Sequence, residues 1–156
     1  MSAVHTPTGQ LWLALDRVHA TMARRVHGLM AEHGLTVPQY RVLRLLNDEG
    51  TLSANTLAER IGVTPGNLTG VLDRLETAGL LSRQRDAQDR RSLRVDINAA
   101  GRELIGRCVP EVRRTVAELF APLSEAEVAS TMSLLNRLET HLTGQSTRNP
   151  VLEATA

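Results

Sequence analysis

The sequence predicts a mainly α-helical fold with a small β-wing, which places the protein in the α+β class. Apolar residues recur at intervals of three and four over most of the 156 residues, as they do in amphipathic helices. Two short helical segments, 54–61 and 64–78, are followed directly by two segments that alternate with period two, 80–85 and 93–97. Period-two alternation predicts strands with one buried face. This order of elements is that of a winged helix-turn-helix.

The composition limits the possible kinds of protein. The 18 basic residues, all of them arginine, nearly balance the 17 acidic residues and give a net charge of +1. A nucleic-acid-binding role must therefore depend on where the charges lie. Cys108 is the single cysteine, and its place on an apolar stripe predicts a buried thiol rather than a redox sensor. The first residues lack the pattern of a signal peptide, and no apolar run is long enough to cross a bilayer. We expect a cytoplasmic protein without a membrane partner.

The N-terminal part of the chain predicts two helices. Residues 10–33 carry a regular apolar stripe and are followed by Gly34, a residue typical of helix C-termini. The next helix begins near Pro38, which suits a first turn because its missing amide hydrogen is not needed there. This helix closes before Gly50, and residues 51–52 can add a very short strand.

The helix-turn-helix is predicted from residues that start and end its two helices. Ser53 is a suitable N-cap for the first helix, and Gly62 ends that helix. Thr64 and Pro65 begin the second helix as a cap followed by a first-turn proline. Ala58 supplies the small residue that two helices need where they touch.

The C-terminal part predicts two further helices. Asn98 is expected to cap a long helix over residues 99–121, and Pro110 inside that helix should kink it. Residues 124–127 have the sequence of a capping box. They open a final helix that is expected to end at Gly144.

The segment 83–94 concentrates positive charge between the predicted strands. It holds five arginines against two aspartates, a local excess of +3, and such a local excess attracts DNA phosphates. The surrounding sequence resembles the MarR family of bacterial transcriptional regulators over roughly residues 11–142. The motifs that carry the resemblance are Asn67-Leu68-Thr69-Gly70, Leu75-Glu76, Gly79-Leu80-Leu81, Asp89-Arg90-Arg91 and Gly101. One departure is Asn98, where the family usually has Thr or Ser, but Asn caps a helix equally well.

The resemblance implies a homodimeric repressor that is released from a near-palindromic DNA operator by a small aromatic or phenolic effector. It implies a helical dimerisation region of residues 10–34 and 99–144, and a winged helix-turn-helix DNA-binding domain of residues 36–98. Residues 1–9 and 145–156 are expected to be flexible tails. We expect no cofactor, no metal and no enzymatic activity, because the sequence lacks metal-ligand spacings and catalytic motifs. The alternative is a winged-helix module used only for protein contacts, against which the arginine-rich wing argues.

The second helix of the helix-turn-helix is expected to lie in the major groove. Asn67 can pair with adenine there, and Thr69 can meet either a thymine methyl group or a phosphate. Arg74 is expected to contact a phosphate or to pair with Asp73 on its own helix. The predicted DNA-binding residues, in full, are Ser53, Asn55, Thr56, Thr64, Pro65, Gly66, Asn67, Thr69, Gly70, Arg74, Arg90 and Arg91.

By resemblance, Arg90 or Arg91 enters the minor groove from the tip of the wing, where a narrow, A·T-rich groove attracts a cation. Asp89 is expected to orient one of these two arginines. Residues at the start of the preceding helix could meet phosphates through their backbone amides.

Candidate effector residues lie on the first two helices. Trp12, Asp16, Tyr40 and Arg41 could line a pocket between the dimerisation and DNA-binding regions, with Arg41 meeting an anion, or they could have ordinary core and surface roles. The helix around His19 resembles that of urate-responsive family members, in which a histidine at the dimer axis makes DNA binding depend on pH. A structural interface histidine is the alternative. Arg41 stands where those members have an acidic residue, so urate itself is not expected.

Overall fold

The structure, a computed structural model, describes residues 6–85 and 93–146. The predicted wing tip, with Asp89, Arg90 and Arg91, lies outside the described residues. The chain divides into two compact units, one that reaches to Val116 and one that begins at Ala117. Each unit is described by itself. The predicted division into dimerisation and DNA-binding regions remains a prediction.

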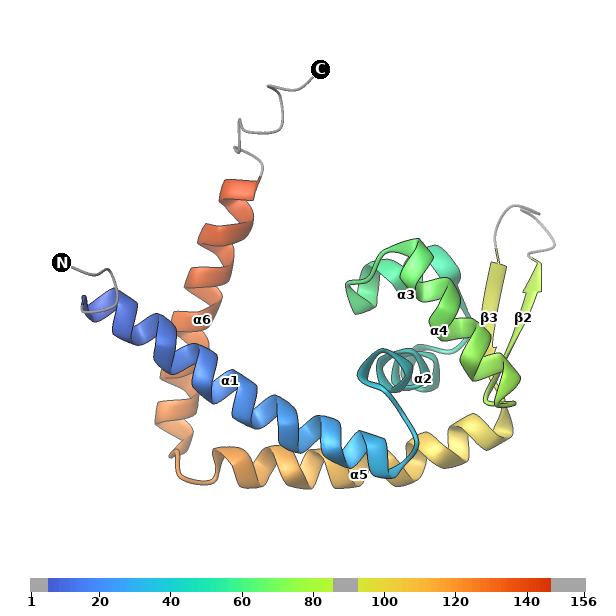
Figure 1. Cartoon of the computed structure of the whole chain (residues 1–156), viewed down its shortest axis with the longest axis horizontal. Coiled ribbons are helices and arrows are strands. Elements are labelled where there is room, and N and C mark those ends of the chain that lie inside the picture. The colour runs from blue at the N-terminus through green and yellow to red at the C-terminus, as the bar shows by residue number, and fades with distance from the viewer. Residues whose placement is uncertain (1–5, 86–92, 147–156) are drawn as a thin grey trace, which may run out of the picture. The chain divides into compact units, whose positions relative to one another are not determined.

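The predicted mainly helical fold with a small sheet is confirmed. In chain order the elements are α1 (Pro7–Glu32), α2 (Val37–Glu49), β1 (Leu52–Ser53), α3 (Ala54–Ile61), α4 (Pro65–Thr77), β2 (Leu81–Arg85), β3 (Leu93–Ile97), α5 (Ala99–Phe120) and α6 (Glu125–Ser146) (Figure 1). The three strands form an antiparallel sheet in the order β1-β3-β2. Leu81 lies opposite Ile97 at the base of the β2–β3 pair, and Leu52 of β1 lies opposite Val95.

Two helix ends differ from the sequence prediction. α1 begins at Pro7 rather than at residue 10, so residues 7–9 are helical and not part of a tail. The reason is an N-cap: the Thr6 hydroxyl oxygen accepts a hydrogen bond from the Gly9 amide at 3.1 Å, and proline follows the cap. α6 continues past Gly144 to Ser146, because Gly144 is not among the glycines with positive φ and so does not end the helix.

α5 continues through Pro110 as one helix to Phe120. Pro110 has no amide hydrogen, so the carbonyl oxygen of Gly106 one turn earlier lacks its usual helical donor. Figure 1 shows the ribbon of α5 bending along its length without a break.

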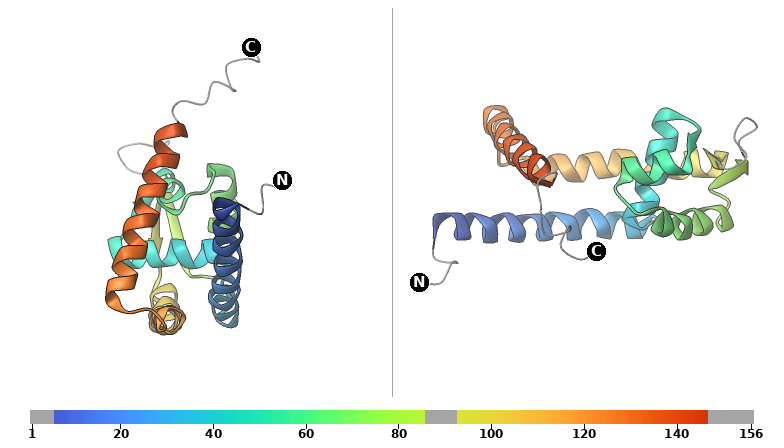
Figure 2. Two further views of the ribbon diagram at one scale, coloured as in Figure 1. Left: turned by 90° about the vertical axis from the view of Figure 1, so that its left-hand side faces the viewer. Right: turned by 90° about the horizontal axis from the view of Figure 1, so that it is seen from above.

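One hydrophobic core holds the first unit together. It joins the C-terminal end of α1 to α2, α3, α4, the sheet and the N-terminal half of α5. Its largest fully buried side chains are aliphatic, as the scarcity of aromatics predicts, and include Leu43, Leu46, Leu57, Leu72, Leu75 and Ile105. Figure 2 shows the β2–β3 pair at one end of this unit beside α4. Within the described residues, no helix is long and apolar enough to cross a membrane.

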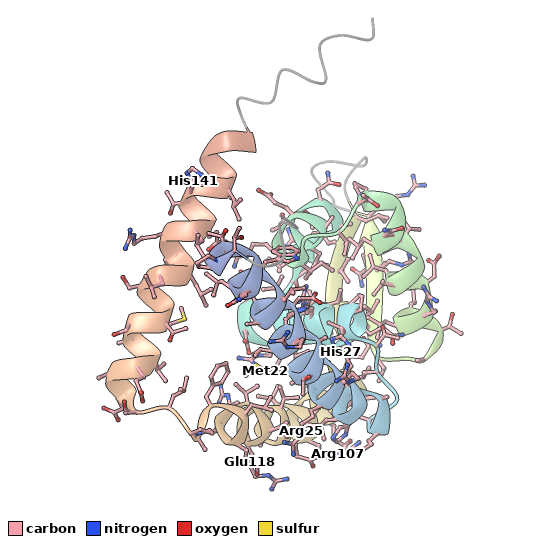
Figure 3. All side chains as sticks on the ribbon, turned by 60° about the vertical axis from the view of Figure 1, so that its left-hand side comes forward. Met22, Arg25, His27, Arg107, Glu118 and His141 are labelled. Carbon is pink, nitrogen blue, oxygen red and sulfur yellow. The ribbon has the colours of Figure 1, made fainter. Side chains whose placement is uncertain are left out.

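Most of the large apolar side chains that remain exposed lie on α1 and α6, and the others lie on β3, at the C-terminal end of α5 and between α5 and α6. On α1 they occupy the N-terminal half, where Trp12 is 70% exposed and Val18 51% exposed. Figure 3 shows side chains projecting along α1, with Met22, Arg25 and His27 marking successive positions further along the helix. On α6 the exposed large apolar residues, most of which follow helical spacing, are Val128, Met132, Leu134, Leu135, Leu138 and Leu142.

Candidate nucleic-acid interface

The turn between α3 and α4 is built from the residues that the sequence singled out. Gly62 adopts the left-handed conformation with φ 73°, which favours glycine because a Cβ atom is strained there. Ala58 is buried where the two helices meet. The Ser53 and Thr64 hydroxyl oxygens accept hydrogen bonds from the Thr56 and Asn67 amides, at 3.0 and 3.3 Å. Both predicted N-caps are therefore confirmed.

α4 has one buried edge and one exposed face. Leu68, Val71, Leu72 and Leu75 are buried in the core. The opposite face exposes seven residues, which are Pro65, Gly66, Asn67, Thr69, Asp73, Arg74 and Thr77, and Gly70 between them is half-buried. A helix held by one edge with small and polar residues on its outer face has the shape that the major groove admits.

Most polar side chains on this face already have a partner within the protein. The Thr69 hydroxyl donates to the carbonyl oxygen of Pro65 at 3.0 Å, and Arg74 Nε donates to that of Gly70 at 2.9 Å. Asp73 pairs with Arg83 and not with Arg74, so the predicted Asp73–Arg74 pair is wrong. The i to i+4 spacing lets the Arg74 guanidinium reach its own helix backbone instead.

Arg83 on β2 joins the wing to α4, and the sequence analysis did not single it out for this role. Its Nε donates to Glu76 Oε2 at 2.8 Å, and its Nη1 lies 2.7 Å from Asp73 Oδ1. Its backbone amide also donates to Glu76 Oε1 at 3.1 Å. The hydrogen bonds from the Arg83 guanidinium are the main cause that lowers the pKa of Glu76. Arg83 is thus committed to two carboxylates on α4, and the start of the wing is fixed to that helix.

The start of α3 offers one exposed polar side chain. Asn55 is exposed, whereas Ser53 and Thr56 are half-buried and their hydroxyl oxygens lie 2.8 Å apart. The hydroxyls of Ser53 and Thr56 are therefore hydrogen-bonded to each other. Asn55 is therefore the polar side chain of this turn that faces solvent.

The N-terminus of α5 packs tightly against the turn that follows α4. The Asn98 amide donates to the carbonyl oxygen of Leu80 at 3.0 Å, and the Asn98 side chain donates to that of Gly79 at 3.2 Å. A Cβ atom added at Gly101 would lie 2.2 Å from the same Leu80 oxygen and 2.8 Å from Ile97 Cγ1. The backbones therefore approach as closely as glycine allows, and α5 is coupled to the end of α4.

A shallow hollow between α2 and α3 contains two of the predicted effector residues. It has a volume of about 270 Å³ and is lined by Tyr40, Arg41, Arg44, Leu45, Asp48, Arg60 and Ile61. Arg44 pairs with Asp48, and Arg60 pairs with Glu49 on the rim of α2. Arg41 Nη1 donates to the carbonyl oxygen of Ile61 at 3.4 Å.

The other three candidate effector residues do not line this hollow. Trp12, Asp16 and His19 lie on the N-terminal half of α1, and all three are exposed. The structure thus brings Tyr40 and Arg41 together and places the α1 candidates elsewhere.

Cys108 is fully buried in the core, as predicted for a structural thiol. Burial raises the pKa of the Cys108 thiol, and the nearby Glu111 carboxylate raises it further. A raised thiol pKa disfavours the reactive thiolate. Within residues 6–85 and 93–146, no group of His, Cys, Asp and Glu side chains is arranged to hold a metal ion.

An exposed helix over a helix-turn-helix core, flanked by an antiparallel wing, defines the class of winged helix-turn-helix proteins. The family model described as "MarR family" matches residues 35–93. The HTH-type transcriptional repressor Mb2911 of Mycobacterium bovis is 33% identical over 132 residues, which are 85% of this chain and 93% of that protein. The chain therefore belongs to the MarR family of HTH-type transcriptional regulators, which are DNA-binding proteins and not enzymes.

Two solved structures that are similar to this chain contain a bound partner. A mutant MarR from E. coli complexed with operator DNA is 25% identical, with a TM-score of 0.75 over 83% of this chain and 93% of that one. The PcaV transcriptional regulator from Streptomyces coelicolor in complex with its natural ligand is 28% identical, with a TM-score of 0.70 over 89% and 96% of the two chains. Structural relatives thus include one bound to DNA and one bound to a ligand.

Proposed function

We propose that this protein is a homodimeric repressor that binds a near-palindromic operator and leaves it when a small aromatic acid binds. The observation that carries this proposal is the exposed face of α4, which presents small and polar residues over a fully buried edge. The wing, fixed to that helix through Arg83, stands next to it. Membership of a family of DNA-binding regulators makes operator binding the natural use of this surface.

The exposed apolar residues of α1 and α6 support a second copy as the partner. Each helix carries its own stripe of large side chains in contact with solvent, and such stripes are rarely left uncovered in soluble proteins. A twofold arrangement would present two copies of α4 to DNA. Half-sites would then lie about one helical turn apart, roughly 34–36 Å.

The DNA contacts that we propose come from three places. α4 contributes its outer face, including Asn67, and the start of α3 contributes Asn55 together with backbone amides that suit phosphates. The wing contributes Arg90 and Arg91. Arg74 is a phosphate contact in this scheme, because it is exposed on α4 and, among the described residues, only its Nε is hydrogen-bonded.

The hollow between α2 and α3 is the proposed effector site. An aromatic ring would pack on Tyr40 and Leu45, and its carboxylate would meet Arg41, whose side chain has only a long contact to a carbonyl oxygen. The volume of about 270 Å³ accommodates a single substituted ring. The ligand-bound PcaV regulator shows that a structural relative takes a ligand of its own.

The test combines oligomeric state with DNA binding. Light scattering after size exclusion should give the mass of a dimer, and fluorescence anisotropy should show salt-dependent binding to duplexes that the full chain selects from a random pool. Aromatic acids added to that complex should lower the anisotropy, and Arg41→Ala should remove this response. A monomer, or a chain that selects no duplex, would refute the proposal and favour a protein-contact module.

A further inference from the structure

The hydrogen bonds of α4 determine which chemical groups it can offer to a base. Thr64 accepts from the Asn67 amide, Arg74 donates to Gly70, and Asp73 is paired with Arg83. The side-chain amide of Asn67 has no hydrogen-bond partner within the part of the chain that the structure describes. It is therefore available to bind adenine bidentately.

Thr69 is in a different position. It is exposed on the outer face, but its hydroxyl donates to the carbonyl oxygen of Pro65 at 3.0 Å. A threonine hydroxyl has a single hydrogen, so this bond uses the only donor of the side chain. The group that remains for an apolar contact with DNA is the Cγ2 methyl.

The neighbours of Thr69 leave that methyl accessible. On a helix, the residues three and four positions earlier lie on the same face, and here they are Gly66 and Pro65. Gly66 has no side chain, and an added Cβ there would have no atom within 4 Å. Neither of these two neighbours carries a long side chain that would cover the Thr69 methyl.

We propose that Thr69 determines operator specificity by packing its methyl group against the C5 methyl of a thymine, so that each half-site carries a T·A pair at that position. This inference rests on the proposed function, because it requires α4 to lie in the major groove. Apolar contact with the thymine methyl is one of the recognised ways in which side chains distinguish T·A from C·G. Of the two roles open to Thr69 from the sequence, the hydrogen bond to Pro65 favours this one over a phosphate contact.

The test removes either the Thr69 methyl group or the thymine C5 methyl group. The probe is a duplex that the full-length protein selects from a random pool, in which each thymine is replaced in turn by deoxyuridine, which lacks the C5 methyl. Thr69→Val keeps the methyl and loses the hydroxyl, whereas Thr69→Ser keeps the hydroxyl and loses the methyl. Circular dichroism checks that both variants are folded, and anisotropy gives their dissociation constants.

The wild type should lose about fourfold in affinity per half-site at one deoxyuridine position, which corresponds to about 0.8 kcal/mol for one buried methyl. Thr69→Val should bind like the wild type and show the same loss. Thr69→Ser should bind the thymine probe about fourfold more weakly per half-site, with both half-sites of the dimer affected, and show no further loss with deoxyuridine. The inference is overturned if Thr69→Val is weak while Thr69→Ser is normal, or if no thymine position matters to the wild type. A chain that selects no duplex refutes the proposed function instead.

Discussion

Replacing Gly101 by alanine should destabilise the protein although alanine is the better helix former. The added Cβ would lie 2.2 Å from the carbonyl oxygen of Leu80, so either α5 or the turn must move by about 1.3 Å to restore an ordinary contact distance of about 3.5 Å. Such overpacking costs about 1–3 kcal/mol. The movement also strains the hydrogen bond between the Asn98 amide and the same oxygen, which is worth about 1 kcal/mol.

The gain in helix propensity opposes this cost but does not cancel it. Glycine to alanine in a helix interior stabilises by about 0.5–1 kcal/mol, so the net loss for Gly101→Ala is about 1–3 kcal/mol. For a chain of this size, that corresponds to a fall in melting temperature of roughly 2–12 °C. Urea unfolding followed by circular dichroism, at one fixed protein concentration, measures the change in unfolding free energy.

Gly106 provides a matched control in the same helix. No atom lies within 4 Å of a Cβ added there, so Gly106→Ala should stabilise the protein by about 0.5–1 kcal/mol. The two substitutions are chemically identical and should change stability in opposite directions. If both raised the midpoint of unfolding equally, the close approach of α5 to Leu80 would not exist in solution.

Four further substitutions test the other parts of the structure. Arg83 lowers the pKa of Glu76 in the folded protein. Their pairing therefore stabilises the fold fully above the ordinary glutamate pKa of about 4.3, and this stabilisation is lost as pH falls through the lowered folded-state pKa. Urea titrations at decreasing pH should show this loss in the wild type and not in Glu76→Gln. Arg90→Ala should weaken operator binding and flatten the plot of log affinity against log salt, by about 0.9 for each phosphate that the variant no longer neutralises, as measured by anisotropy. Cys108→Ser should destabilise by about 1–3 kcal/mol because it buries a hydroxyl, and the native thiol should react slowly with Ellman's reagent until urea exposes it. Gly66→Ala should stabilise α4 by about 0.5–1 kcal/mol yet weaken operator binding, since its methyl group occupies the face proposed to meet DNA; unchanged binding would mean that this face does not enter the groove.

The order of elements and the helix starts are predictable because they depend on local rules. Ser53 and Thr64 are identified as N-caps from residue type and spacing alone, and both bonds are present. The capping box that opens α6 is likewise present, with Glu127 and Ser124 bonded reciprocally. The start of α1 escapes prediction because Thr6 and Pro7 precede the first apolar residue of the stripe, so a periodicity argument begins too late.

The contacts that join separate elements could not be predicted, because they depend on tertiary packing. Arg83 counts as part of a basic wing in the sequence, yet it reaches back seven and ten positions to two carboxylates on α4. Nothing in its local sequence separates it from Arg85, which is exposed. His33 and Glu111 lie 3.2 Å apart although 78 positions separate them in the chain. The hollow at Tyr40 depends in the same way on how α2 packs against α3.

The interruption of hydrogen bonding in α5 has a consequence for operators of different lengths. Gly106 is a glycine, the residue with the most flexible backbone. Pro110 has no amide hydrogen, so the carbonyl oxygen of Gly106 has no helical donor. Bending at this level therefore costs less than elsewhere along α5. In a twofold assembly, a small change of curvature in each copy would alter the separation of the two α4 helices. Palindromes whose arms are set one base pair closer or further apart should then still be bound, each by a slightly different curvature of the same two helices.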